Sequence, residues 1–140
     1  KVAQNLYNAY FETYKGVAFY NEYVRQHIDA HGYAQNLFGR KYYGSNAHKS
    51  KNYLIQGTGA DYTKDLLPDI ADLIRGTEIT LQGYLHDEFS FAMPLDVTSE
   101  KVKEIQTIME RVNTPIKMTV DIEETTTDWS KKEDYAFKST

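Results

Sequence analysis

The chain has 140 residues, which is the length of a single domain and enough to bury a hydrophobic core. It contains no cysteine, which excludes disulfides and thiolate zinc sites, and its formal net charge of −4 argues against uniform attraction to a polyanion. No apolar run approaches the roughly 20 residues that span a bilayer, and no signal-peptide pattern opens the chain, so we expect a cytoplasmic protein without membrane contact.

Helical periodicity dominates the first half of the chain. Apolar residues recur every four residues over residues 2–14 and at helical spacing over residues 17–28, which predicts two helices interrupted at Gly16. Gly32 is suited to cap the second helix. Residues 33–43 are expected to be irregular or to form a short hairpin.

A long helix is predicted from Ala47 to Arg75, closed by Gly76. Pro68 is expected to kink or divide it, because the proline ring removes a backbone donor.

Two strand-like runs with period-2 alternation of apolar and polar residues follow over residues 78–93, which predicts a β-hairpin with one buried face. Its tip carries the tripeptide His86-Asp87-Glu88. The apolar positions that we assign to the buried face are Ile79, Leu81, Leu85, Phe89, Phe91 and Met93.

The last third of the chain predicts a helix and then a strand. Thr98 begins a capped amphipathic helix over residues 98–112, and apolar residues alternate strictly with polar ones over residues 115–122. The fold class is therefore α+β, with helices in the N-terminal half and then an antiparallel sheet packed against a helix. We expect a helical part (1–76), a sheet part (77–124) and a weakly docked or undocked tail (125–140).

The acidic turn is the first candidate for chemistry. Asp87 and Glu88 repel each other as adjacent carboxylates, and a divalent cation such as Mg²⁺ or Mn²⁺ removes that cost. We therefore predict a metal site that handles phosphate, with a solvated acidic turn as the alternative.

Basic residues form the second candidate. Residues 1–57 have a formal charge of +4 and the remaining residues −8. The basic stretch, with tyrosines interleaved, is suited to contact phosphates and stack on bases, and a solvated positive loop is the alternative. Its members are Arg40, Lys41, Lys49 and Lys51.

A polar stripe forms the third candidate. His48, Asn52 and Gln56 are spaced four residues apart, so they share one face of the predicted long helix. Such a stripe can donate to minor-groove acceptors, which every base pair presents in nearly equivalent positions, and an ordinary exposed polar face is the alternative. Gly57 and Gly59 beside it permit close approach of a backbone or base.

Five segments, taken in order, resemble the palm and fingers of family A DNA polymerases, the class of bacterial DNA polymerase I and several phage replicases. Residues 10–17 are similar to Tyr-Phe-x-x-Tyr-Pro-Gly-Val with Lys15 in place of proline, and residues 32–41 to Gly-Tyr-x-x-Thr-x-x-Gly-Arg-Arg. The other segments are Asn52–Asp61, His86-Asp87-Glu88 and Asp128-Trp129.

The resemblance implies roles for the candidate residues. Asp87 matches a metal-ligand carboxylate and Glu88 a residue close to the metals, so we assign both to a catalytic centre that uses two Mg²⁺ ions in the complete enzyme. His86 matches a residue near the primer terminus. The stripe residues match minor-groove contacts, with His48 where arginine is usual. Primer–template DNA and dNTP are the implied partners.

Two motifs of the family are missing from the chain: the strand with the first catalytic aspartate and the fingers helix that binds the incoming nucleotide. We therefore expect the chain to act with the N-terminal remainder of a polymerase, on the same or a separate chain, and to be inactive alone. Two alternatives stay open, a non-catalytic nucleic-acid-binding or scaffold module and a part of a phage RNA polymerase, whose corresponding motif is usually His-Asp-Ser.

Overall fold

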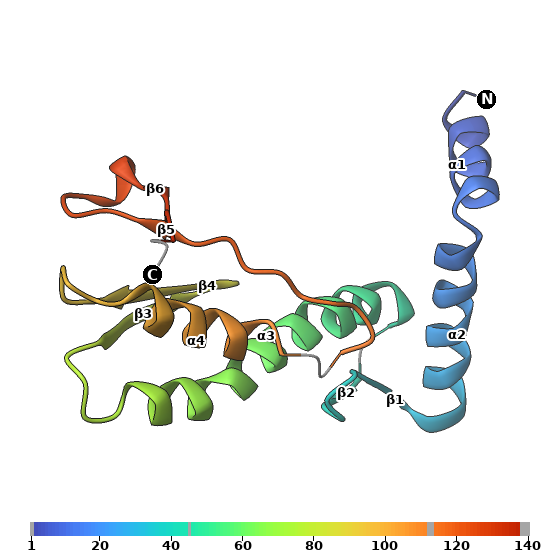
Figure 1. Ribbon diagram of the computed structural model, residues 1–140. Helices are drawn as coiled ribbons and strands as arrows, with labels where there is room; N and C mark the ends of the chain where they lie inside the picture. The colour runs from blue at the N-terminus through green and yellow to red at the C-terminus, as the bar shows by residue number, and fades with distance from the viewer. Residues whose placement is uncertain (1, 45, 112–113, 138–140) are drawn as a thin grey trace. The chain divides into compact units, whose positions relative to one another are not determined.

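The computed structural model describes the chain except for residues 1, 45, 112–113 and 138–140. It contains two compact units, residues 1–62 and 63–140, and the long helix α3 (Ala47–Ile74) contributes residues to both (Figure 1). The mixture of helices with small antiparallel sheets confirms the α+β class. The expected division into three parts stays a prediction.

Two helices open the first unit, as predicted. They are α1 (Val2–Thr13) and α2 (Lys15–His31). The break between them falls at Tyr14, whose φ of −105° and ψ of 64° are not helical. It does not fall at Gly16, as predicted, because Gly16 lies inside the first turn of α2. Gly32 ends α2 in the left-handed conformation, and its N–H donates to the Ile28 carbonyl.

A short hairpin follows α2 and completes the core of the first unit. Strands β1 (Tyr33–Gln35) and β2 (Lys41–Tyr43) pair antiparallel, which confirms the hairpin alternative for residues 33–43. The buried core joins α2, β1 and α3 through Val24, Ala34 and Leu54.

A buried polar network fixes the β1–β2 loop to α3. The Asn36 side chain accepts the backbone N–H groups of Phe38 (3.1 Å) and Arg40 (2.9 Å) and donates to the Asp61 carboxylate at 2.7 Å. Asn36 and Asp61 are both buried, so each satisfies a polar group that would otherwise be costly to desolvate.

The helix α3 runs through Pro68 as one element of 28 residues, so the alternative that the proline divides it is wrong, and a kink stays a prediction. Leu66 and Ile70 flank the proline, lie one turn apart and are almost fully buried. Burial of these apolar side chains on neighbouring turns offsets the loss of one backbone hydrogen bond.

The predicted hairpin of the second unit is confirmed as β3 (Thr80–Leu85) and β4 (Glu88–Ala92). Its register shifts between Leu81 and Gly83, so Gln82 is an extra residue, a β-bulge. The bulge reverses the alternation. Tyr84 turns to the half-buried face and Leu85 outward, where it is 67% exposed. Our assignment of Leu85 to the buried face is therefore wrong.

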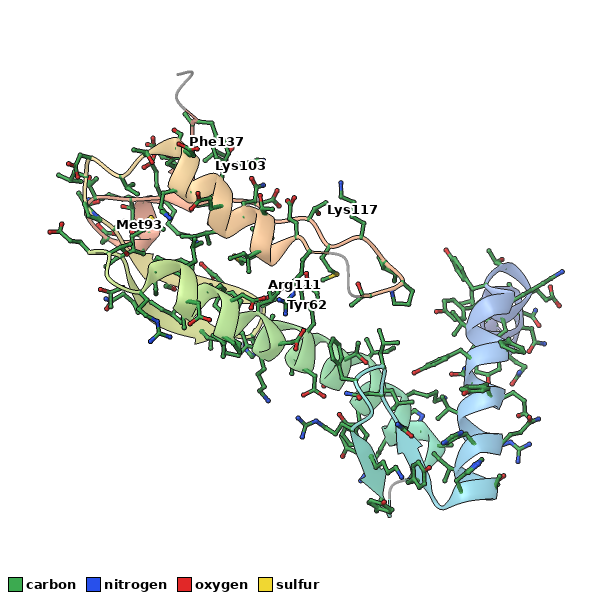
Figure 2. The ribbon with its side chains drawn as sticks, turned by 60° about the horizontal axis from the view of Figure 1, so that its bottom comes forward. Tyr62, Met93, Lys103, Arg111, Lys117 and Phe137 are labelled. Atoms are coloured by element: carbon green, nitrogen blue, oxygen red, sulfur yellow. The ribbon has the colours of Figure 1, made fainter. Side chains whose placement is uncertain are left out.

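Helix α4 (Ser99–Met109) begins as predicted, with the Thr98 hydroxyl accepting the Lys101 N–H at 3.3 Å. The helix ends at Met109, with Glu110 as its C-cap, so the predicted end at residue 112 is too late. Just beyond α4, Arg111 pairs with two aspartates of α3, Asp65 at 2.7 Å and Asp69 (Figure 2). This contact fixes the exit of α4 to the second half of α3.

The predicted strand 115–122 is absent. Residues 114–122 form no strand, and the strand pairing that follows them in the described residues joins β5 (Glu123–Glu124) to β6 (Glu133–Asp134), with a 3₁₀ turn η1 (Trp129–Lys131) between them. The described strands therefore make three two-stranded sheets. Alternation selects an extended chain but supplies no neighbouring strand, and Ile116 is left 74% exposed.

Tyr135 and Phe137 each contact α4, so the alternative of an undocked tail is wrong and weak docking stays a prediction. The Tyr135 hydroxyl lies 3.2 Å from the Ser99 hydroxyl, and the Lys103 ammonium lies 5.4 Å from the centre of the Phe137 ring (Figure 2). Within the described part of the chain, no helix combines the length and apolar character needed to cross a bilayer.

Candidate functional site

The acidic turn is a two-residue hairpin loop. Leu85 and Glu88 form the last pair of the ladder, which leaves His86 and Asp87 as the loop. A loop of this length requires a positive φ at its first residue, and His86 has φ of 56°. A side chain in that conformation costs about 1–2 kcal/mol, which only a constrained turn imposes. The prediction that Asp87 lies on a β-turn is confirmed.

The two carboxylates of the turn have different surroundings. Both are exposed. Glu88 accepts a hydrogen bond from the Lys132 ammonium at 3.3 Å, and Lys132 also bonds Glu123 at 2.6 Å. Glu123 and then Glu88 raise the pKa of Lys132 above its usual value. Asp87, in contrast, makes no ion pair with another described residue.

These carboxylates do not complete a metal centre by themselves. Oxygen donors suit Mg²⁺, but no group of three or more His, Asp or Glu side chains is placed to hold an ion within the described ranges. The acidic turn thus offers one open carboxylate, Asp87, and one neutralised by a lysine, Glu88. Further metal ligands would have to come from residues other than Asp87 and Glu88.

The polar stripe lies on α3, within the first unit. His48, Asn52 and Gln56 are all exposed on one face of the helix, and no hydrogen bond to another described residue engages their side chains. His48 and Asn52 line an open groove of about 500 Å³ together with Tyr10 and Tyr20. Gln56 is not among the lining residues. The stripe is therefore available to a ligand.

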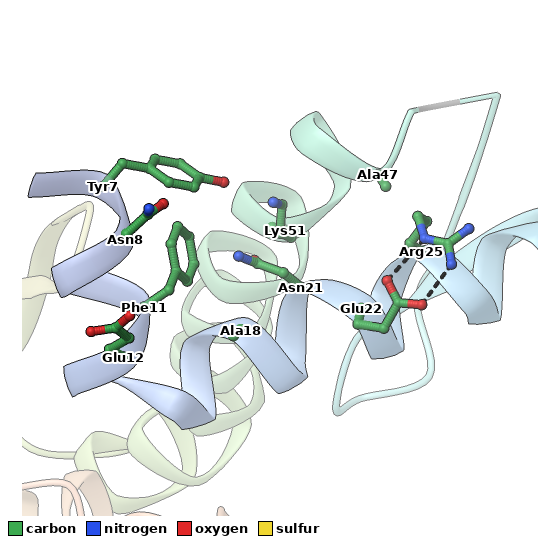
Figure 3. Close-up of a pocket in the computed structure, with 10 residues that line it drawn as sticks. All are labelled: Tyr7, Asn8, Phe11, Glu12, Ala18, Asn21, Glu22, Arg25, Ala47 and Lys51. Atoms are coloured by element: carbon green, nitrogen blue, oxygen red, sulfur yellow. Dashed lines mark hydrogen bonds and ion pairs between the residues drawn. The ribbon is translucent and has the colours of Figure 1, made fainter. Parts of the chain in front are cut away.

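A second groove of about 600 Å³ lies between α1, α2 and the start of α3 (Figure 3). It shares Lys51 and Asn21 with the first groove. Arg25 and Lys51 are the basic residues that line this groove. Arg25 forms an ion pair with Glu22 at 2.5 Å, whereas Lys51 has no carboxylate partner within the described residues.

The basic stretch does not act as one surface. Arg40 donates through Nε and Nη2 to Asp61, at 2.6 Å in its shortest contact, so one edge of its guanidinium serves the buried network while the side chain stays 54% exposed. Lys41 is exposed and lies 4.3 Å from the centre of the Tyr33 ring. Lys41 therefore combines a free ammonium with an aromatic face.

Gly57 also has a role that differs from the one expected. A Cβ built on Gly57 would overlap the hydroxyl of Tyr42 and come within 3.0 Å of its Cζ. The group that approaches this glycine is thus a tyrosine of β2, within the first unit. Gly59 meets nothing within 4 Å.

Sequence reasoning did not find Lys132 or Asp61 as partners of candidate residues. Lys132 lies 44 residues from Glu88, and Asp61 lies 21 residues from Arg40. No spacing rule links residues so far apart, and a single charged residue in a polar segment carries no signal of its own.

Comparison with known proteins supplies the class. The fold resembles part of a polymerase domain: a solved structure titled "POL domain of Pol1 from M. smegmatis complex with DNA primer-template and dNTP" superposes with a TM-score of 0.70 at 24% identity, over 77% of this chain and 22% of that one. The sequence profile of "DNA polymerase family A" matches residues 1–131. The chain belongs to that family.

Curated relatives agree with this assignment. DNA polymerase I of Aquifex aeolicus is 29% identical over 113 residues, and DNA polymerase DpoZ of Salmonella phage PMBT28 is 28% identical over 119 residues. These alignments cover 78% and 77% of this chain and 19% of each relative. DNA polymerase I of Deinococcus radiodurans is 26% identical, over 74% of this chain and 12% of its own length. The chain thus spans about a fifth or less of these relatives.

Proposed function

We propose that the chain is the C-terminal part of a template-directed DNA polymerase and works with the remainder of such an enzyme. Its substrates are then primer–template DNA and dNTP. The phage RNA polymerase alternative loses its support, because the matching profile and relatives are DNA polymerases.

The observation that carries the proposal is the exposed Asp87 carboxylate at the tip of a tight hairpin in a family A chain. A two-residue loop on paired strands fixes the position of this carboxylate better than a longer loop would. Asp87 then serves as one of the carboxylates of a two-metal centre, and a segment outside the described residues supplies the others. When bound, the metal ions neutralise charge on the attacking hydroxyl and the leaving pyrophosphate.

The neighbouring residues take supporting roles. His86 positions the primer terminus by a hydrogen bond, and Glu88 balances charge near the metals as a non-ligand. His48, Asn52 and Gln56 donate to minor-groove acceptors of paired bases, which permits readout of correct pairing without sequence preference. Lys41 binds a phosphate beside the aromatic face of Tyr33.

The experiment on Asp87 uses the complete polymerase that contains this chain. Asp87→Asn keeps the size of the side chain and removes its charge, and Asp96→Asn is the matched control because Asp96 is an exposed carboxylate in the next loop. We expect Asp87→Asn to lower the single-turnover rate of primer extension by about 100-fold or more, with primer–template Kd little changed. A rate within threefold of the Asp96→Asn control would refute the assignment.

The stripe is tested with modified DNA. Replacing a purine by its 3-deaza analogue at the primer end removes the minor-groove N3 acceptor. We expect Gln56→Ala to lower the extension rate on normal DNA and to be insensitive to the analogue, whereas the unmodified enzyme and the Gln35→Ala control slow down on it. If Gln56→Ala and the analogue act additively, the stripe does not contact that acceptor.

A non-catalytic nucleic-acid-binding module is the second candidate. It is favoured by the incomplete metal donor set and by the pairing of Glu88 with Lys132. Under this alternative, Asp87→Asn changes neither the extension rate nor the primer–template Kd.

A further inference from the structure

Lys132 connects the acidic turn to the end of the chain. Its ammonium lies between two carboxylates, Glu123 on β5 at 2.6 Å and Glu88 on β4 at 3.3 Å. The side chain is only 23% exposed, and its ammonium lies 4.5 Å from the centre of the Trp129 ring. Three neighbours from two hairpins therefore hold one lysine in place.

The neighbouring Lys131 shows that this arrangement is specific. Lys131 is 67% exposed and pairs only with Asp128, three residues away on the same turn, in the described structure. A pair of that kind is local and contributes little. Lys132 instead bonds Glu88, which lies 44 residues away in the sequence.

The hairpin geometry explains why Glu88, and not Asp87, meets this lysine. Glu88 is the first residue of β4 and is paired with Leu85, so the ladder fixes its side chain on the outward face of the sheet. Asp87 lies in the loop, outside the ladder. The lysine therefore reaches one carboxylate of the adjacent pair and leaves the other open.

We propose that Lys132 is a positioning residue for the acidic turn, which occupies Glu88 with a tethered ammonium so that only Asp87 is open to a divalent cation. This inference rests on the proposed function and adds to it a residue that separates the roles of the two carboxylates. Lys132 also relieves their mutual repulsion, because it supplies the positive charge that a metal would otherwise have to supply.

The lysine and a divalent cation then compete for Glu88. Removing the lysine frees Glu88 as a second oxygen donor, so the chain should bind a divalent cation more tightly. Exposed ion pairs of this kind change an equilibrium by about two- to fivefold.

The test measures Mn²⁺ binding to the 140-residue chain by the loss of the electron paramagnetic resonance signal of free Mn²⁺. We expect Lys132→Met to tighten Mn²⁺ binding by about two- to fivefold relative to Lys131→Met, which removes the same charge one residue away. We expect Lys132→Arg to bind as the unmodified chain does. In the Glu88→Gln background, Lys132→Met should have no effect beyond that of Lys131→Met.

Two results would overturn the proposal. One is equal Mn²⁺ affinity for Lys132→Met and Lys131→Met, and the other is an undiminished Lys132→Met effect in the Glu88→Gln background. Hydrogen exchange of the Tyr135 amide, which donates to the Ile122 carbonyl at 2.8 Å, reports in each variant that the end of the chain is still folded. If Lys132→Met loses this protection, the comparison of Lys132→Arg with Lys132→Gln decides in its place.

Failure of the Lys132 proposal can be distinguished from failure of the proposed function, because the first is measured by Mn²⁺ binding and the second by primer extension. If Lys132 has no positioning role, Asp87→Asn still lowers the rate of primer extension in the complete polymerase by about 100-fold or more. If the chain is not catalytic, Asp87→Asn leaves extension unchanged while the coupling between Lys132 and Glu88 persists in the Mn²⁺ measurement.

Discussion

The packing of Tyr42 against Gly57 allows a matched pair of substitutions. Gly57→Ala and Gly59→Ala both place alanine inside α3, where alanine is favoured over glycine by about 0.8–1.0 kcal/mol. Only the methyl group at position 57 overlaps Tyr42. The helix-propensity gain is thus common to both variants, and their difference in stability isolates the cost of overpacking.

The cost of overpacking at position 57 follows from the contacts that Tyr42 would lose if it moved. Its ring packs on the core of Val24, Ala34 and Leu54 and stacks with Tyr53 at 5.8 Å. A rigid ring cannot move its hydroxyl away without shifting these contacts, so we expect overpacking to cost about 1–3 kcal/mol. The free energy of unfolding of Gly59→Ala should exceed that of the unmodified chain by about 1 kcal/mol. The free energy of unfolding of Gly57→Ala should be lower than that of Gly59→Ala by about 1–3 kcal/mol.

Urea unfolding followed by tyrosine near-ultraviolet circular dichroism measures this difference, because ten of the twelve tyrosines lie in residues 1–62. Tyr42→Phe in the Gly57→Ala background removes the overlapping hydroxyl and should recover part of the loss. Equal midpoints for Gly57→Ala and Gly59→Ala would contradict the packing argument.

Three further predictions concern other residues. Asp61→Ala removes the acceptor of the buried Asn36 amide and should destabilise the first unit by about 1–3 kcal/mol in the same assay, with no such loss if water enters the site. Hydrogen bonds from the Arg25 guanidinium and then from the Gln26 amide lower the pKa of Glu22 from 4.5 to about 2, so these contacts stabilise the fold fully above pH 4.5 and lose this contribution as the pH falls through about 2. A carboxyl-carbon NMR titration should place the Glu22 midpoint near 2 and, in Arg25→Met, higher, because only the Gln26 hydrogen bond then remains. His86→Gly removes the cost of a positive φ and should stabilise the second unit by up to about 1 kcal/mol, measured by Trp129 fluorescence in urea, whereas His86→Ala should not.

Local patterns predicted most of the fold. The periodicity of residues 2–28 and 47–75 gave the helices, and the alternation of residues 78–93 gave the hairpin, because these signals depend on neighbours within one or two turns. The strand expected at 115–122 failed for the opposite reason. A strand is completed by a partner elsewhere in the chain, and alternation alone does not identify one.

The candidate site was predicted in position but not in its contacts. The loop placement of Asp87 follows from residues 79–93 alone, and the exposure of Asn52 and its neighbours in the stripe follows from helical spacing. The pairing of Glu88 with Lys132 and of Arg40 with Asp61 depends on tertiary folding, so no local pattern predicts either.

The bulge at Gln82 places a constraint on chain length in β3. In a regular ladder with Leu81 opposite Phe91, Gly83 would lie opposite Phe89, so the extra residue at 82 is what places the Tyr84 ring beside its stacking partner Phe89, 5.1 Å away. The side chain at 82 is exposed and free to vary. Variants that exchange or delete this glutamine should keep the acidic turn in place, whereas a residue inserted between Gly83 and Leu85 should misalign it.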